Sequence, residues 1–128
     1  MTYSFTIKYP RGREGRKLWN TRYGMNAIYA GKHWAARRED AQLWHLQTAA
    51  AIRKQIKQPR LLEHPVVIRY WWNDRLDLSN HAYMAKLIED GMKGVLIKDD
   101  SRKYVAGLEH RFHEQDCIRV EVEEIEDD

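Results

Sequence analysis

The sequence contains little cysteine and has no long apolar run. Cys117 is the single cysteine among 128 residues, so no internal disulfide can form, and a reducing compartment such as the cytoplasm is expected. No apolar stretch approaches the roughly 20 residues that span a bilayer, so no contact with a membrane is expected. The first residues also lack the charged-then-apolar pattern of a secretory signal peptide.

Several motifs that reveal enzyme classes are missing as well. The chain has no Gly-rich phosphate-binding loop, no serine-nucleophile motif and no dinucleotide fingerprint. Its six histidines show no zinc-like spacing with the lone cysteine. These absences exclude the motif-based forms of nucleotide hydrolases, serine hydrolases, dehydrogenases and zinc domains.

Charge is distributed unevenly, although the formal net charge is only +3. Residues 1–38 contain nine lysines and arginines against one acidic residue, Glu14, whereas residues 109–128 contain nine acidic residues against two arginines. A basic segment of this density attracts polyanions such as nucleic acids, although a merely solvated surface has the same composition. The acidic end, about residues 121–128, is expected to be a solubilising tail.

Apolar residues recur with the periods of strands and helices over most of the chain. Tyr3, Phe5 and Ile7 alternate with polar residues, which predicts a half-buried strand that ends before Pro10. Apolar residues at three- and four-residue steps predict two helices, and aromatic or β-branched runs predict further strands. The predicted helices span residues 34–57 and about 80–92, and the further strands span residues 66–72, 104–112 and 118–122.

Residues 11–32 show little periodicity and interleave basic, glycine and aromatic residues, which is typical of a long loop. A loop of this length in a small domain is usually functional or disordered. The last two strands are separated by the polar residues 113–116 and are expected to form a terminal hairpin. The order of elements predicts one α+β domain over residues 1–128, with a mixed sheet and with helices packed on one face of it.

The best candidates for catalytic and metal-binding residues follow the second predicted strand. Asp77 lies where that strand gives way to a helix, Lys86 and Asp90 share a face of the helix, and Asp99 and Asp100 follow it. Magnesium prefers oxygen ligands and usually takes one or two protein carboxylates, and it activates water beside a phosphodiester. The structural alternatives are a helix-start aspartate at 77, an ion pair between Lys86 and Asp90, and a solvated turn at 99–100.

In order, the segment reads Asp77-Leu78-Ser79-Asn80, then Lys86, Asp90-Gly91 and Asp99-Asp100-Ser101. This order resembles the signature of RusA-type Holliday junction resolvases: Asp-x-Asp-Asn, a helix with a lysine that ends in Asp-Gly or Asp-Ala, and then Asp-Asp. The N-terminal half resembles the family through Met25-Asn26 and Gly31-Lys32-His33-Trp34 before the long helix. The likeness covers nearly the whole chain.

The resemblance implies a RusA-like homodimeric endonuclease that binds four-way DNA junctions and cuts them with magnesium, or manganese in its place, in recombination and repair. By motif position, Asp77 and Asp100 are expected to be catalytic metal ligands, with Asp99 as a further metal ligand. Lys86 is expected to contact the scissile phosphate or to steady developing charge, with Asp90 beside it as a further catalytic residue. The resemblance also suits a cytoplasmic, nucleoid-associated protein encoded by a phage or mobile element.

Ser79 departs from the family pattern, which has an aspartate at this position. A serine hydroxyl is a weak metal ligand without negative charge, and serine is also a common residue at the start of a helix. Three hypotheses follow: a junction resolvase, a branched-DNA binder with weakened or lost cleavage, and a metal-dependent nuclease without preference for junctions.

DNA contacts are expected from the basic N-terminal half. Contacts to phosphates position DNA without reading bases, which suits recognition of branch shape. Trp19, Tyr23 and Tyr29 either stack on unpaired bases or belong to the core. The expected DNA-binding residues are Arg11, Arg13, Arg16, Lys17, Arg22, Asn26, Lys32, His33, Arg37, Arg38 and Asn80.

Overall fold

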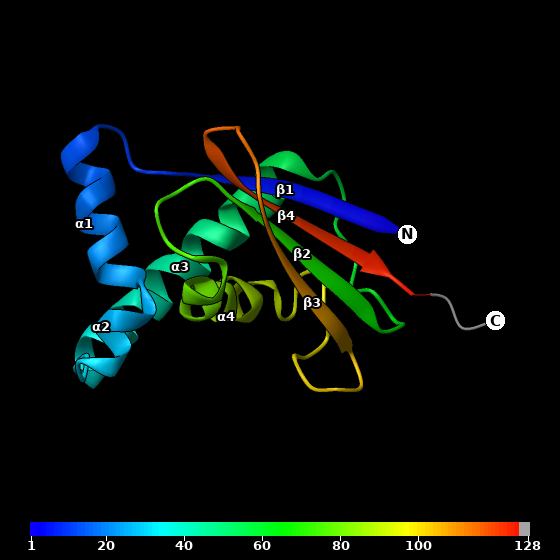
Figure 1. The fold of residues 1–128 in the computed structure, drawn as a ribbon. Helices are drawn as coiled ribbons and strands as arrows, with labels where there is room; N and C mark the ends of the chain where they lie inside the picture. The colour runs from blue at the N-terminus through cyan, green and yellow to red at the C-terminus, as the bar shows by residue number, and fades with distance from the viewer. Residues whose placement is uncertain (126–128) are drawn as a thin grey trace.

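A computed structural model describes residues 1–125, in which a four-stranded sheet packs against helices (Figure 1). The strands are β1 (Thr2–Lys8), β2 (Val66–Trp72), β3 (Val105–Phe112) and β4 (Cys117–Glu124). The helices are α1 (Arg13–Tyr23), α2 (Met25–Tyr29), α3 (Trp34–Gln55), the 3-10 helix η1 (Leu78–His81) and α4 (Ala82–Met92). Within this range, no helix has the length and apolar character to cross a membrane.

The sheet is mixed, and its strands lie in the order β1-β4-β2-β3. β4 is antiparallel to both β1 and β2, whereas β3 is parallel to β2. The predicted terminal hairpin is therefore wrong, because β2 lies between β3 and β4. In this central position every side chain of β2 is buried or partly buried. Residues 113–116 are long enough to carry the chain past β2, since two strand spacings amount to roughly 10 Å.

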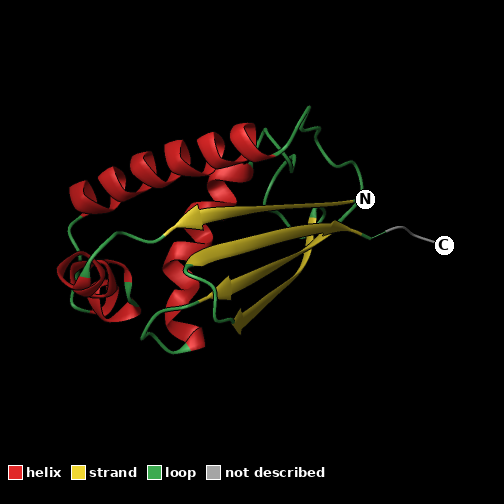
Figure 2. Cartoon of the chain, turned by 90° about the horizontal axis from the view of Figure 1, so that it is seen from above, coloured by secondary structure: helices red, strands yellow, loops and turns green. Residues whose placement is uncertain are grey.

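The helices α3 and α4 cover one face of the sheet, which confirms the predicted α+β architecture (Figure 2). Alternate residues of the strands face these helices and are buried, as the period of two predicts. The buried side chains of the sheet include Phe5, Ile68, Tyr70, Trp72, Ile118, Val120 and Val122.

The opposite face of the sheet is polar and is held together by Arg69. Its guanidinium forms ion pairs with Glu109 of β3 and with Glu121 and Glu123 of β4, at 2.9–3.2 Å. The predicted acidic tail is thus wrong as far as residue 124, because these glutamates belong to a paired strand. The rest of that prediction, residues 126–128, lies outside the described residues.

The basic segment 11–32 is not a loop as predicted, because it contains the helices α1 and α2. The sequence conceals α1 because its apolar stripe consists of little more than Trp19 and Tyr23, one helical turn apart. Both rings are buried against Trp44 of α3, with ring centroids 6.3 and 5.2 Å away. The packing of three aromatic side chains therefore stabilises a helix that is otherwise polar.

The helices α3 and α4 approach closely where Gly91 meets Thr48. A Cβ atom at position 91 would lie 2.8 Å from the Cβ of Thr48, closer than such atoms approach in proteins. Asp90 is the neighbouring residue on α4, so this contact also fixes the end of the helix on which Asp90 lies.

We expect Gly91→Ala to lower the free energy of unfolding by about 1–2 kcal/mol. The overpacking cost of about 1–3 kcal/mol exceeds the gain of about 1 kcal/mol from replacing glycine in a helix. Urea denaturation measures the change. Thr48→Ala in the same chain is expected to recover part of the loss, because it removes the Thr48 methyl and hydroxyl groups at 3.2 Å from the new Cβ but keeps the Thr48 Cβ at 2.8 Å, and because that buried hydroxyl has no hydrogen-bond partner in the described chain. A double variant no more stable than Gly91→Ala would contradict this account.

Candidate functional site

Two aspartates and two lysines meet at the C-terminal end of α4. The Nζ atom of Lys86 lies 3.1 Å from the carboxylate of Asp90 and also forms an ion pair with Asp100. The Nζ atom of Lys93 lies 3.5 Å from Asp90 and 3.3 Å from Asp100. About a quarter of each aspartate side chain is exposed, against about half of Lys86. We call these four residues the acid–lysine cluster.

The local sequence explains why these residues converge. Lys86, Asp90 and Lys93 lie on one face of the chain because they are separated by helical steps of four and three residues. Asp100 joins them because the loop after α4 folds back, with Leu96 and Ile97 buried. The amide of Gly94 donates to the carbonyl of Ile97, and the positive φ of 79° at position 94 allows this tight turn.

Charge pairing dominates the protonation of the cluster. The hydrogen bond from Lys86 holds the pKa of Asp100 well below its ordinary value. Partial burial alone would lower the pKa of Lys86, but Asp100 and Asp90 outweigh burial and raise it. Beside the cluster, burial raises the pKa of Glu89, whose side chain is almost completely covered. Asp100 and both lysines are therefore charged near neutral pH.

Asp77 is not brought to this cluster. It is the residue before η1, and its side chain is exposed and makes no hydrogen bond or ion pair within residues 1–125. Asp90 lies in the last turn of α4, whose 11 residues are roughly 16 Å long. Asp77 and Asp100 therefore lie at opposite ends of α4, and the described residues contain no group of three acidic, histidine or cysteine side chains that could hold one metal ion.

Ser79, a residue type common at helix starts, and Asn80, predicted as a DNA contact, both lie inside η1. The residues before η1 and α4 are Asp77 and His81, and neither side chain caps its helix. The amide of Asn80 donates to the carbonyl of Asp77, which closes the 3-10 turn. Ser79 is exposed, and Asp99 lies next to the acid–lysine cluster in sequence without an ion pair to it in the described chain.

Asp90 and Asp100 fit a divalent cation. Both carboxylates approach the Nζ atom of Lys86. They therefore face one common position, which the positively charged ammonium group of Lys86 occupies. Oxygen ligands from one or two carboxylates are the usual protein contribution to a magnesium site. A metal ion at this position would require Lys86 to withdraw from between the two aspartates.

Sequence reasoning missed the buried network that supports Asp77. The hydroxyl of Tyr9 donates to Asp74 Oδ2 at 2.9 Å, and His81 Nε2 lies 2.8 Å from Asp74 Oδ1. The ring of His81 stacks on Trp72 with centroids 4.2 Å apart. Asp74 also accepts a hydrogen bond from the amide two residues later, at 3.0 Å. Aspartate often forms a turn of this kind before a helix. The position of Asp74 shortly before the predicted helix was therefore the one sign in the sequence of its structural role.

Arg22 and Lys32, predicted as DNA contacts, both bind a buried acid. The carboxylate of Asp40 on α3 is fully buried and forms ion pairs with both cations. The hydroxyl of Tyr83 on α4 donates to the same carboxylate at 2.7 Å. Burial alone would raise the pKa of Asp40, but the hydrogen bonds from Lys32, Tyr83 and Arg22 outweigh burial and lower it.

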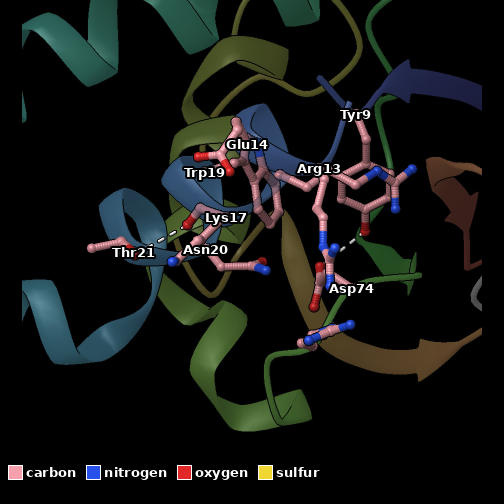
Figure 3. A pocket seen from close by; sticks show the side chains of 10 residues that line it. Tyr9, Arg13, Glu14, Lys17, Trp19, Asn20, Thr21 and Asp74 are labelled. Atoms are coloured by element: carbon pink, nitrogen blue, oxygen red, sulfur yellow. Dashed lines mark hydrogen bonds between the residues drawn. The ribbon is translucent and has the colours of Figure 1, made fainter. Parts of the chain in front are cut away.

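Three of the predicted DNA contacts line a basic pocket (Figure 3). The pocket has a volume of about 640 Å³ and lies between α1 and the turn that contains Asp74. The rings of Tyr9 and Trp19 form part of its wall, and both are mostly buried. The basic residues that line it are Arg13, Arg16, Lys17 and Arg75.

The remaining predicted contacts are spread over the N-terminal half. Arg11 precedes α1, Asn26 lies on α2, and Arg37 and Arg38 lie in the first turns of α3, all with exposed side chains. His33 caps α3, since its Nδ1 accepts a hydrogen bond from the amide of residue 35 at 3.1 Å. This observation gives His33 a structural role of the kind that polar residues before helices usually have.

No protein-family model and no curated protein matches this chain.

We expect Asp40→Asn to cost about 3–5 kcal/mol of stability at pH 7, because it leaves Lys32 nearly buried without its counter-charge. The pKa of Asp40 is lower in the folded chain than in the unfolded chain, so its contribution is complete above the unfolded value of about 4 and is lost as the pH falls through the folded value. Urea denaturation at pH 7 and pH 3 measures both effects.

Glu39→Gln, which changes an exposed neighbour, is the control. The stability gap between wild type and Asp40→Asn is expected to shrink at pH 3. A stability difference that does not depend on pH, or one below about 1 kcal/mol as for an exposed ion pair, would show that the ion pairs of Asp40 do not stabilise the fold.

Proposed function

We propose that this chain is a metal-dependent endodeoxyribonuclease of the RusA type that acts on branched DNA, with the four-way junction as its preferred substrate. The observation that carries the proposal is the acid–lysine cluster. Asp100 lies 14 residues after Lys86, yet the two side chains are in contact. Two carboxylates and two ammonium groups at one partly exposed position are a chemically suitable arrangement for hydrolysis of a phosphodiester.

Each member of the cluster has a role in this proposal. Asp90 and Asp100 would hold magnesium or manganese by their carboxylate oxygens. When bound, the ion supplies polarisation of the phosphate and a nucleophilic water. Lys86, displaced from between the aspartates, would remain beside them and neutralise charge that develops on the phosphate oxygens. Lys93, which contacts the same carboxylates, would support the scissile phosphate in the same way.

The basic pocket and the exposed cations around it would position the DNA. Arg13 and Lys17 line the pocket, and their cationic groups would bind phosphates irrespective of base sequence. Arg16 already has partners within the chain, because it forms an ion pair with Asp116 and its Cζ atom lies 5.1 Å from the centroid of the Tyr9 ring. Arg13 and Lys17 are therefore the better candidates for strong phosphate contacts.

A binder of branched DNA that does not cut is the second candidate. Two observations favour it: the family's aspartate is replaced by Ser79, and lysines already neutralise Asp90 and Asp100. A protein of this kind would bind junctions with a steep salt dependence and leave them intact.

We expect the purified protein to cut a synthetic four-way junction in magnesium or manganese, and Asp100→Asn to reduce the rate by on the order of 100-fold or more. Gel analysis of labelled junction strands measures the rate, and linear duplex of the same sequence tests junction preference. Glu114→Gln, an exposed acid in the β3–β4 turn, is the control. Asp77→Asn shows whether the aspartate at the other end of α4 also takes part.

Three outcomes would each contradict one part of this proposal. Junctions that are bound but intact in both metals would select the non-cutting binder. Full activity of both Asp90→Asn and Asp100→Asn would place the site elsewhere. Equal rates on duplex and junction would leave a nuclease without junction preference.

We expect the double variant Arg13→Gln/Lys17→Gln to weaken junction binding and to reduce the slope of log affinity against log salt by about 2, because two phosphate contacts are lost. Fluorescence anisotropy at several salt concentrations measures this slope. The control is Arg53→Gln/Lys54→Gln in the last turn of α3, which removes the same charge. If both double variants lower the slope equally, the pocket is not a specific contact.

A further inference from the structure

The basic pocket has hydrogen-bond acceptors in its wall as well as cations. Arg13, Lys17 and Arg75 line it with exposed cationic donors, whereas Glu14 and Asn20 line it with a carboxylate and an amide oxygen. A carboxylate repels a phosphate, but it accepts hydrogen bonds from the amino groups of bases. The mixture therefore fits a ligand that combines an anionic group with a neutral hydrogen-bond donor, which a nucleotide does.

The side chain of Asn20 has an unpaired acceptor. Its Oδ1 atom is buried and has no hydrogen-bond partner among the described residues. Buried polar atoms of proteins are almost always hydrogen-bonded, so an unpaired oxygen in the wall of a pocket favours a ligand that donates to it. Adenine, cytosine and guanine have exocyclic amino groups that are such donors, whereas thymine has none.

Tyr9 and Trp19 form a fixed apolar wall beside Asn20 (Figure 3). Their ring centroids lie 5.0 Å apart, and the rings meet edge to face. The hydroxyl of Tyr9 is held from two sides, because it donates to Asp74 and accepts from the amide of Asn73. A wall that is already in place lets a flat ligand bind without first ordering these side chains.

The pocket is larger than a single phosphate group requires. Its volume of about 640 Å³ lies within the range of about 300–1,000 Å³ that is usual for small organic ligands. A base inside a duplex is stacked and paired, so it reaches a recessed pocket only when it leaves the stack. The cost of leaving is least where pairing or stacking is already disturbed, as at a branch point.

We propose that the basic pocket binds one nucleotide of branched DNA whose base has left the stack. Asn20 Oδ1 and the carboxylate of Glu14 accept from the amino group of the base, so adenine, cytosine and guanine bind better than thymine. Arg13, Lys17 and Arg75 bind the adjoining phosphates. That the nucleotide comes from branched DNA rests on the proposed function, whereas the contact with an amino-bearing base rests on the wall of the pocket alone.

Free mononucleotides test the contact with the base independently of cleavage and of junction binding. In NMR titrations, deoxycytidine and deoxyadenosine monophosphate are expected to shift the side-chain amide signal of Asn20 and the indole signal of Trp19. Their dissociation constants are expected to be at least about fivefold lower than that of thymidine monophosphate, which lacks the amino group. Inorganic phosphate is expected to leave the side-chain signal of Asn20 unchanged.

Asn20→Ala removes the acceptor and keeps a helix-forming residue in α1. In this variant, the indole signal of Trp19 is expected to report dissociation constants for the three nucleotides that agree within about twofold, because the contact that separates them is lost. Gln47→Ala, which removes an exposed amide from α3, is the control and is expected to keep the difference. Equal affinities of the wild-type chain for all three nucleotides, or a shift of the Asn20 signal by phosphate alone, would overturn the contact with the base.

Junctions with one unpaired nucleotide at the branch point test the source of the nucleotide. Binding is measured by fluorescence anisotropy without divalent metal, so that no strand is cut. We expect the wild-type chain to bind the junction with an unpaired cytosine at least about fivefold more tightly than the junction with an unpaired thymine, and Asn20→Ala to bind both equally. A chain that discriminates mononucleotides but binds no junction would refute branched DNA as the substrate, and with it the proposed function, while the contact with the base would stand.

Discussion

The buried carboxylate of Asp40 determines how the N-terminal helices sit on the rest of the molecule. A fully buried carboxylate must be paired, and its partners come from α1, from the connection before α3 and from α4. Arg22, Lys32 and Tyr83 can meet it only in one arrangement of these elements. The network therefore holds α1, with the basic pocket beside it, against α3 and α4.

Local patterns in the sequence predicted most elements, because their side chains bury with a regular period. Helix α3 and strand β2 were predicted almost to the residue. Helix α1 was missed because two aromatic side chains supply its packing, too few to show a period. The pairing of β3 was mispredicted because a short connection permits a hairpin but does not require one, and β3 and β4 each pair with β2.

In the candidate site, too, contacts between residues close in sequence could be predicted, whereas most contacts between residues distant in sequence could not. Helical spacing predicted that Lys86 and Asp90 lie together, and the ordered motif indicated that Asp100 joins them. The rise of α4 could have shown that Asp77 lies too far along the helix. The pairing of Lys32 and Arg22 with Asp40 could not be predicted, because an acid on α3 reveals nothing in the sequence about which cations reach it.

The contact between Gly91 and Thr48 couples the substitutions that are tolerated at two positions distant in sequence. Chains that keep the helices α3 and α4 at this separation can accept alanine at position 91 only together with glycine at position 48, because the closest contact is with the Cβ of residue 48. The two positions should therefore covary among descendants of this sequence. Asp90 is adjacent to Gly91 on α4. Substitution of the buried Thr48 on α3 would therefore be limited by the need to keep the partly exposed Asp90 in place.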